Sequence, residues 1–347
     1  MTRVDPKSAS FTENIMKTLI YVLIASCCLG CATVTGLFGQ SGSILVTYYA
    51  PARGPGTNGE EVVYFLKQVE FASGSEQRTR IYFCSIKPDG TDRKEIIWLW
   101  KDQPDQFLEN YPTAATMDIN AATKRAAIGI EQGQRGGLFV VNLDGSGFHP
   151  LWPREWNEDR PTKAGYPTWS PDGQWIAFHE YRFENGFNYY RIAKFQPDST
   201  GYTPLTERNA ENMQPAWSPK GDLIAYVNDR IANPARNIHA VDLWLMGSHG
   251  GDKRDTKQWG RYPRWSPDGK FILHSGILLV DASSGKRVNA SQKFPPVFPK
   301  WARSGFLEVL PEGINFTPPN GEGTRPLLKN VSRRSRSSDL ENGGSRW

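Results

Sequence analysis

The chain has 347 residues, among them 33 glycines, 25 prolines and 12 tryptophans. Few stretches have the length and apolar spacing of a helix, so turn-forming and aromatic residues favour one large all-β domain. The net charge is +5, but the basic residues are spread along the chain without an aromatic-lined basic stripe. This distribution argues against a nucleic-acid-binding protein.

The first segment, residues 1–42, has the pattern of an export signal or membrane anchor with its linker. No charged residue occurs across residues 18–38, and the stretch begins with an apolar run. Three cysteines, Cys27, Cys28 and Cys31, lie directly behind that run. This arrangement looks like a bacterial lipoprotein signal, in which one cysteine becomes lipidated.

The choice of the lipidated cysteine depends on the start codon. With Met16 as the start, Cys31 gives the more reasonable signal length, whereas with Met1 as the start Cys27 fits better. We take Cys31 as the preferred site. An uncleaved transmembrane helix is the alternative, since about 20 uncharged residues can span a bilayer. Either reading predicts an exported protein on the periplasmic side of a membrane, held there by a lipid or an N-terminal anchor.

A repeated motif determines the expected fold. Good copies of Trp-Ser-Pro-x-Gly followed by an apolar strand begin at Trp169, Trp217 and Trp265, and an eroded copy begins at Trp301. These tryptophans are 48, 48 and 36 residues apart. Residues 111–113, Tyr-Pro-Thr, are interpreted as a fifth copy that has lost the tryptophan. A repeat of this length predicts a solenoid or propeller.

Each repeat predicts two β-hairpins. The Pro-Asp-Gly turn joins the first hairpin, and a second hairpin with an Asp-Gly turn follows, as in residues 81–97 and 137–151. Four short strands in each repeat are typical of a propeller blade. We therefore expect an all-β propeller of about six four-stranded blades over residues 43–328. The predicted blades are 43–104, 105–152, 153–207, 208–256, 257–292 and 293–328.

The two ends of the predicted propeller differ from its middle. The first blade lacks the Trp-Ser-Pro motif, and the strand at residues 43–49 is expected to complete the last blade and close the ring. Closure matters because an open propeller would expose unpaired strand edges. Residues 329–347 are rich in serine and arginine and are expected to form a disordered tail.

The motif Trp-Ser-Pro-Asp-Gly followed by Ile-Ala-Phe, with a hairpin ending in Asp-Gly-Ser-Gly, resembles the TolB-type, WD40-like propeller repeat. The resemblance covers residues 60–328 and implies the fold. Its clearest relatives are periplasmic partners in the Tol envelope system, and others are propeller domains attached to peptidases. Because the family is functionally broad, the resemblance carries little weight on activity.

Acidic residues before glycine are interpreted as turn caps rather than metal ligands. Asp89, Asp144, Asp172 and Asp268 all stand in Asp-Gly turns, and Lys220 replaces the aspartate in one copy. A carboxylate is therefore not required at that position, whereas the glycine supplies the positive φ of the turn. We expect no metal and no cofactor.

The histidines and cysteines offer little support for catalysis. The five histidines have no metal-ligand spacing, but His179 and His274 follow comparable strands. No nucleophile or phosphate-binding motif occurs. The sequence therefore predicts a protein that is not an enzyme, with a carbohydrate-active propeller of the lyase or hydrolase type as the alternative. Cys84 is expected to be a lone buried thiol, and the repeat tryptophans are expected to fill the spaces between blades.

The turns predict which face binds a partner. Successive turns of a four-stranded meander alternate between its two ends, so the second turns and the inter-blade connections share one face. We expect these segments to be longer and more varied than the tight turns, and hence to bind an envelope protein or a cell-wall component as a monomeric scaffold. The residues expected on this face are Trp152, Arg154, Trp156, Arg160, Arg182, Asn185, Phe187, Arg208, Asn212, Arg230, Arg236, Trp259 and Arg261.

Overall fold

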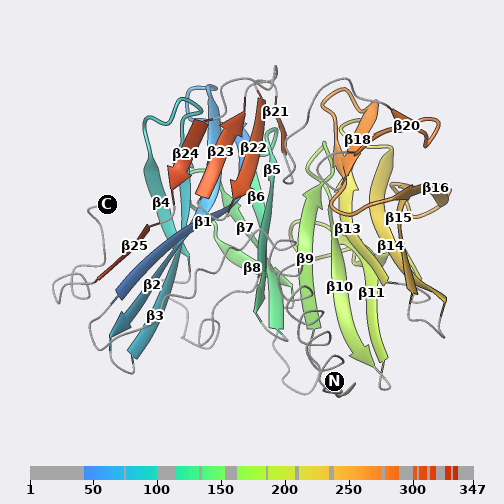
Figure 1. Cartoon of the computed structure of the whole chain (residues 1–347), viewed down its shortest axis with the longest axis horizontal. Coiled ribbons are helices and arrows are strands. Elements are labelled where there is room, and N and C mark those ends of the chain that lie inside the picture. Colours follow the sequence, from blue (N-terminus) through green and yellow to red (C-terminus); the bar gives the residue numbers. More distant parts are fainter. Residues whose placement is uncertain are drawn as a thin grey trace, which may run out of the picture.

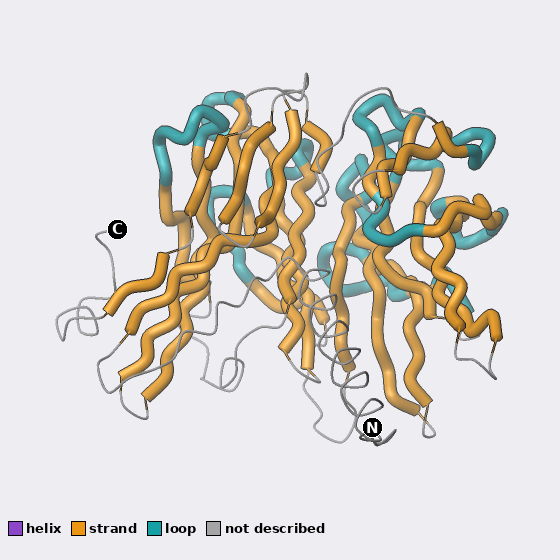
Figure 2. The backbone as a smooth tube through the Cα atoms, in the orientation of Figure 1, coloured by secondary structure: helices purple, strands orange, loops and turns teal. Residues whose placement is uncertain are grey.

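Every regular element of the described chain is a β-strand, and the strands form six antiparallel sheets (Figures 1 and 2). The predicted all-β propeller of six blades is therefore confirmed. The computed structural model describes residues 43–73, 76–99, 114–132, 135–152, 162–184, 187–207, 211–233, 238–274, 278–288, 300–302, 305–310, 313–317, 325–329 and 331–334.

The first three blades cover the N-terminal half of the chain. The first blade contains β1 (Ser43–Pro55), β2 (Glu61–Ser73), β3 (Glu76–Ile86) and β4 (Lys94–Leu99). The second blade contains β5 (Ala114–Asn120), β6 (Arg125–Gln132), β7 (Arg135–Asn142) and β8 (His149–Trp152). The third blade contains β9 (Thr162–Trp169), β10 (Ile176–Glu184), β11 (Phe187–Phe195) and β12 (Thr203–Pro204).

The remaining strands form three further blades and one added strand. The fourth blade contains β13 (Glu211–Trp217), β14 (Leu223–Asn233), β15 (Ile238–Gly247) and β16 (Arg254–Trp259). The fifth contains β17 (Arg264–Trp265), β18 (Phe271–His274), β19 (Leu278–Asp281) and β20 (Arg287–Val288). The sixth contains β21 (Lys300–Ala302), β22 (Gly305–Leu310), β23 (Gly313–Thr317) and β24 (Arg325–Lys329), and β25 (Val331–Arg334) follows it.

The ring closes differently from our expectation. β1 lies inside the first blade, paired with β2, and does not complete the last blade, which has four strands of its own. The added strand comes instead from the C-terminal side, because β25 pairs with the start of β1, with Ser43 opposite Arg334 (Figure 1). Part of the region predicted as a disordered tail is therefore a strand.

A hydrophobic core joins the sixth blade to the first. Leu307 and Ile314 of the sixth blade are fully buried together with Val63, Phe65 and Cys84 of the first. The first and last blades of the chain are therefore packed neighbours, as a closed ring requires.

The innermost strands share a backbone feature that the motif search missed. Ala50, Tyr166, Gln214 and Tyr262 each precede a proline and have φ values between 51° and 57°. In β1, β9 and β13 the pairing with the next strand shifts its register at this point, which defines a β-bulge. The first blade therefore keeps the bulge and the proline of the repeat, although it has lost the tryptophan.

The second blade also has its repeat at a different position from the one predicted. Thr116 Oγ1 accepts a hydrogen bond from the Tyr166 backbone N–H at 3.0 Å, just as Gln214 Oε1 accepts one from the Tyr262 N–H at 2.8 Å. Thr116 thus occupies the place of Gln214 in its own blade. Tyr111, which we had aligned there, lies outside the described residues.

Tryptophans of the repeat fill the spaces between blades, as predicted. Trp169 packs with Leu138 and Val140 of the second blade, and Trp217 packs with Ile192 of the third. Trp265 is likewise buried against the fourth blade. Each of the three is less than a tenth exposed, whereas the side chain of Trp301 lies outside the described part of the chain.

The acidic residues of the tight turns are caps, which confirms their interpretation. Asp172 Oδ1 accepts hydrogen bonds from the Ser170 hydroxyl at 2.5 Å and from the Gln174 N–H at 3.0 Å, and these bonds lower the pKa of Asp172. Asp144 accepts from the Ser146 hydroxyl and N–H in the same way. The glycine that follows each aspartate has a positive φ.

The second turns are shorter than we expected. In the third blade β10 and β11 stay paired as far as Glu184 and Phe187, so Arg182 lies in a strand rather than in a loop. Tyr181 and Tyr190 stand directly opposite each other with ring centroids 5.0 Å apart, and such a cross-strand aromatic pair stabilises the hairpin. Arg230 lies within β14 for the same reason of continued pairing.

Candidate functional site

The innermost strands enclose a central cavity of 710 Å³. Its walls include the first-turn prolines Pro171, Pro219 and Pro267, so this cavity opens at the tight-turn end, which we had not expected to bind a partner. Arg264 also lines it, and burial lowers the pKa of this guanidinium against the opposing effect of Asp118.

The acid of the central cavity has a structural role. Asp118 Oδ2 accepts a hydrogen bond from the Trp169 backbone N–H at 2.8 Å, and Thr168 Oγ1 accepts one from the Trp217 N–H at 3.1 Å. These are bonds between consecutive blades at one repeat position. Asp118 is thereby committed to holding two blades together.

A second recess, of 490 Å³, lies between the third blade and the sheet of the fourth; we call it the fourth-blade groove. Tyr226, Asn228 and Arg230 of β14 line it at alternate positions, because side chains two apart on a strand share one face. Trp244 of β15 adds a second aromatic ring, 6.3 Å from that of Tyr226 between centroids. The full lining is Thr206, Glu207, Asn212, Tyr226, Asn228, Arg230, Trp244, Lys253, Asp255 and Lys257.

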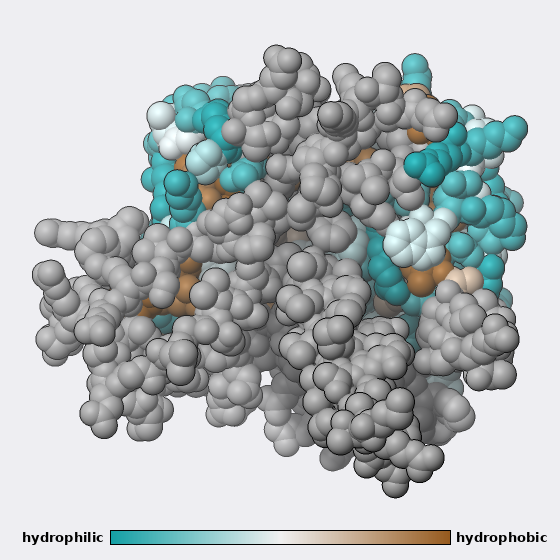
Figure 3. Space-filling view, viewed as in Figure 1, coloured by the Kyte–Doolittle hydropathy of each residue, from teal (hydrophilic) through white to brown (hydrophobic). Residues whose placement is uncertain are grey.

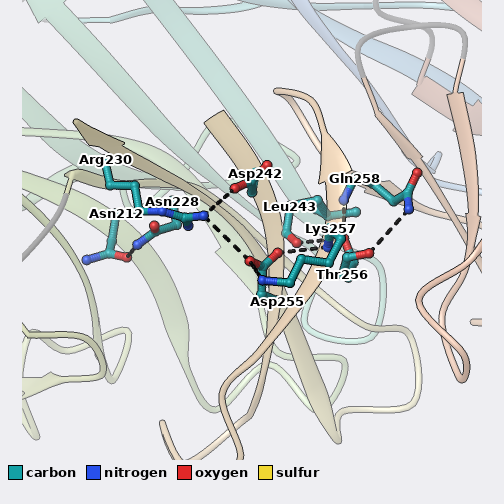
Figure 4. A network of polar contacts seen from close by, with 9 residues as sticks. All are labelled: Asn212, Asn228, Arg230, Asp242, Leu243, Asp255, Thr256, Lys257 and Gln258. Atoms are coloured by element: carbon teal, nitrogen blue, oxygen red, sulfur yellow. Dashed lines mark hydrogen bonds and ion pairs between the residues drawn. The ribbon is translucent and has the colours of Figure 1, made fainter. Parts of the chain in front are cut away.

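Charges in the groove are held in a network (Figure 4). Arg230 Nη2 lies 3.0 Å from Asp242 and 3.8 Å from Asp255. Lys257 Nζ lies 2.7 Å from the same Asp255 carboxylate. The Asn228 amide donates to Asn212 Oδ1 at 2.9 Å. Arg230 and Lys257 therefore each have an acid beside them, and these polar side chains are fixed in orientation.

A wide bulge in β16 shapes one wall. Asp242 pairs with Trp259 and Trp244 with Asp255, so residues 256–258 stand opposite a single residue of β15. Lys257 adopts a φ of 58°, and the Asp255 side chain accepts its backbone N–H at 2.8 Å. The bulge lifts the Lys257 side chain into solvent, where it is 77% exposed.

Four residues predicted for the binding face lie in the fourth blade or directly after it. Asn212 and Arg230 line the groove, Trp259 ends β16 with 60% of its surface exposed, and Arg261 follows it. Arg261 Nη2 donates to Asp229 Oδ2 at 2.7 Å, which fixes the guanidinium. Trp259 had been assigned to a connection at the start of the fifth blade, but it belongs to the outermost strand of the fourth.

The other predicted residues fall elsewhere. Trp152 does not lie on the predicted binding face. It stacks on Tyr202 between the second and third blades and packs against their shared core. Arg182 and Phe187 lie in β10 and β11, but their side chains are outside the described part of the structure. The residues that lie wholly outside it are Arg154, Trp156, Arg160, Asn185, Arg208 and Arg236, together with the cysteines Cys27 and Cys31.

Sequence reasoning missed the residues inside the strands that line the groove. Tyr226, Trp244 and Asp255 occupy regular strand positions and carry no motif. The available signal was alternation: Asn228 and Arg230 continue the buried face of β14 with polar side chains, where a core-facing strand would continue with apolar ones.

The two histidines weighed for catalysis are interior residues. His179 is 4% exposed, and its Nδ1 accepts a hydrogen bond from the Gln214 backbone N–H at 3.4 Å. His274 is 1% exposed, and burial lowers its pKa to about 4. The Gly260 backbone lies so close to His274 that an added Cβ would come within 1.7 Å of Nδ1. Neither histidine lines the groove or the central cavity.

Within the described residues, no group of three or more His, Cys, Asp or Glu side chains is placed to hold a metal ion. The same part of the chain contains no helix that is long and apolar enough to cross a membrane.

The six antiparallel sheets, five of four strands and one of five, define a β-propeller, and solved structures of propellers resemble the chain. A putative TolB from Agrobacterium tumefaciens aligns over 86% of this chain and 100% of its own at 13% identity, with a TM-score of 0.42. TolB from Acinetobacter baumannii aligns over 86% and 66% at 13% identity, with a TM-score of 0.43. A chain of a nidogen/laminin complex aligns over 84% and 96% at 7% identity, with a TM-score of 0.51.

These likenesses concern the fold alone, since all identities are far below the level at which function is shared. No family model matches the sequence, and no curated protein matches it.

Proposed function

We propose that this propeller is an exported binding scaffold of the bacterial cell envelope, and that it holds a protein partner at the connection end of the fourth blade. One observation carries the proposal: Trp259 is a large aromatic that is 60% exposed, and two residues further along the chain Arg261 has its guanidinium held by Asp229. Exposed tryptophans and pre-oriented arginines supply much of the energy of protein interfaces. We call Trp259 and Arg261 the Trp–Arg patch.

The surroundings of the patch also fit a protein partner. On the face shown in Figure 3, the described surface of the fourth and fifth blades is largely hydrophilic, with small hydrophobic areas. An aromatic anchor within a polar surface is the usual arrangement of a non-obligate interface. The propeller itself is expected to be a monomer.

A crosslinking capture from envelope extracts tests this function. The full chain should capture a defined envelope protein, and Trp259→Ala and Arg261→Ala should each reduce the capture strongly. Lys270→Ala, an exposed residue of a tight turn, is the control and should leave it unchanged. Equal capture by all variants would exclude the patch as the binding surface.

We also propose that a lipid on Cys31, or on Cys27, anchors the protein on the periplasmic side of a membrane. The uncharged segment at residues 18–38 and the cysteines behind it support this. Labelled palmitate should enter the protein and should disappear in either Cys31→Ala or Cys27→Ala. Unchanged labelling and membrane retention in both variants would favour a transmembrane anchor.

A further inference from the structure

The fourth-blade groove exists because side chains fill the space between the third and fourth blades less completely than the space between the second and third blades. Between the second and third blades, Trp152, opposite Leu138, stacks on Tyr202 with ring centroids 5.2 Å apart. At the corresponding place in the third blade stands Thr206, whose N–H donates to Ile192 O at 3.2 Å. A threonine cannot fill the volume of an indole, so the space beside the fourth blade stays open.

The polar residues at equivalent positions of the third and fourth blades also differ, and those of the fourth blade leave hydrogen-bonding groups available. In the third blade Glu180 forms an ion pair with Arg191 and accepts from the Tyr202 hydroxyl at 2.8 Å. In the fourth blade Asn228 stands at the position of Glu180, since each follows the buried aromatic of its strand by two residues. Asn228 donates its amide N–H to Asn212 Oδ1. Among the residues that the structure describes, no donor to the Asn228 side-chain oxygen is found, so this oxygen can accept a hydrogen bond from a ligand in the groove.

The groove offers donors and acceptors together with an aromatic wall. The hydroxyl of Tyr226, for which no hydrogen-bond partner is found among the residues that the structure describes, lines the space beside Trp244. Arg230, Lys253 and Lys257 supply N–H donors, and Asp255 supplies acceptors. The negative faces of aromatic rings attract the polarised C–H groups of a ligand.

The charges that line the groove favour a neutral ligand over an anion. Three cations and two acids line the groove, and Asp242 beside it offsets the remaining charge. Arg230 and Lys257 are already paired with Asp242 and Asp255, so an anion would have to compete with these acids. A neutral molecule that both donates and accepts hydrogen bonds meets no such competition.

We propose that the fourth-blade groove binds a neutral saccharide, one or two sugar rings long. Sugar hydroxyls donate to Asn228 and Asp255 and accept from Arg230 and the Tyr226 hydroxyl, while a C–H face packs on Trp244. A volume of 490 Å³ lies in the range of small-molecule sites, about 300–1,000 Å³. This site is separate from the proposed protein-binding patch, because Trp259 and Arg261 do not line the groove.

Titration calorimetry of the full chain tests the proposal with four probes: cellobiose, chitobiose, a glucuronate-containing disaccharide and inorganic phosphate. At least one neutral disaccharide should bind. Tyr226→Phe and Arg230→Met should each weaken that binding by about three- to tenfold, the loss expected for one hydrogen bond. Lys270→Met, which changes an exposed residue of a tight turn, is the control and should bind as the unaltered protein does.

Three results would overturn the proposal. Binding of phosphate or the glucuronate disaccharide alone would show that the groove selects anions. Binding unaffected by both Tyr226→Phe and Arg230→Met, with circular dichroism showing folded variants, would place the sugar elsewhere. Absence of binding by both neutral disaccharides at millimolar concentration would remove the site. None of these results affects the capture of a protein partner, so the two proposals fail separately.

Discussion

The ring of Trp152 stacks on that of Tyr202 with an interplanar angle of 7°, and this contact joins the last strand of the second blade to the third blade. Trp152 also packs near Phe178 and Phe195 of the shared core. Trp152, which we predicted from the sequence to lie on the binding face, is thus part of the packing between blades.

We therefore expect Trp152→Ala to destabilise the fold by about 3 kcal/mol, toward the lower end for a large aromatic because the side chain is only partly buried. Equilibrium urea unfolding measures this. Trp152→Phe keeps an aromatic ring and should cost less. If the Trp152→Ala protein were as stable as the unaltered protein, the assignment of Trp152 to the packing between blades would be wrong.

Trp217→Ala should have a still larger effect, about 3 to 5 kcal/mol, since Trp217 is 8% exposed in the core between the third and fourth blades. Trp259→Ala removes the same side chain from the surface of the fourth blade and should change the free energy of unfolding little. Comparing the two melting curves separates packing from binding. Similar destabilisation by both would contradict the assignment of Trp259 to the surface.

His274 makes the stability of the protein depend on pH. Its pKa is about 4 in the folded chain, because burial disfavours the charged ring, against about 6.5 in the unfolded chain. The unfolded state therefore binds more protons between these values, and stability falls as the pH is lowered from about 6.5 to about 4. The total loss from this group is about 3 kcal/mol.

Urea unfolding at a series of pH values measures the slope. His274→Gln cannot titrate and should flatten the curve in that window, even if the variant is less stable overall. A slope equal to that of the unaltered protein would show that other groups cause the acid sensitivity.

Cys84 should be unreactive in the folded protein. It is a free thiol with no exposed surface, and burial raises its pKa to about 12, with Glu95 acting in the same direction. In a variant with Cys27, Cys28 and Cys31 changed to serine, a thiol reagent should label the chain only after denaturation. Rapid labelling under native conditions would mean that the first blade opens locally.

The sequence predicted those parts of the fold that depend on local chemistry. Tryptophan at a fixed repeat position predicted the packing of Trp169, Trp217 and Trp265, and Asp-Gly pairs predicted the capped turns. The first blade was harder to recognise, because Ala50 and its proline keep the bulge of the repeat without its aromatic residue. Backbone conformation is conserved there between blades while side-chain identity is not.

The candidate sites were less predictable, for a different reason. A basic residue in a predicted connection, such as Arg261, can be recognised in a sequence. A groove cannot, because it forms where a small side chain leaves unfilled the space that a large one occupies in another blade. Thr206 became informative only when the structure placed it opposite Ile192, where the preceding blade has Trp152. Side chains such as Tyr226 and Asp255 come from separate strands, and register decides whether they meet.

The pairing of β25 with β1 has a consequence for the orientation of the molecule. Ser43 lies opposite Arg334, so the first and the last described residues of the chain stand side by side in the first sheet (Figure 1). β1 runs from this edge toward its first turn, which places Ser43 at the end where the inter-blade connections gather. The anchor that we propose upstream of Ser43 would therefore join the propeller at the connection end, which also carries Trp259, and not at the tight-turn end. We therefore expect a partner of the Trp–Arg patch to be a protein at the membrane surface, within reach of the segment between the lipidated cysteine and Ser43.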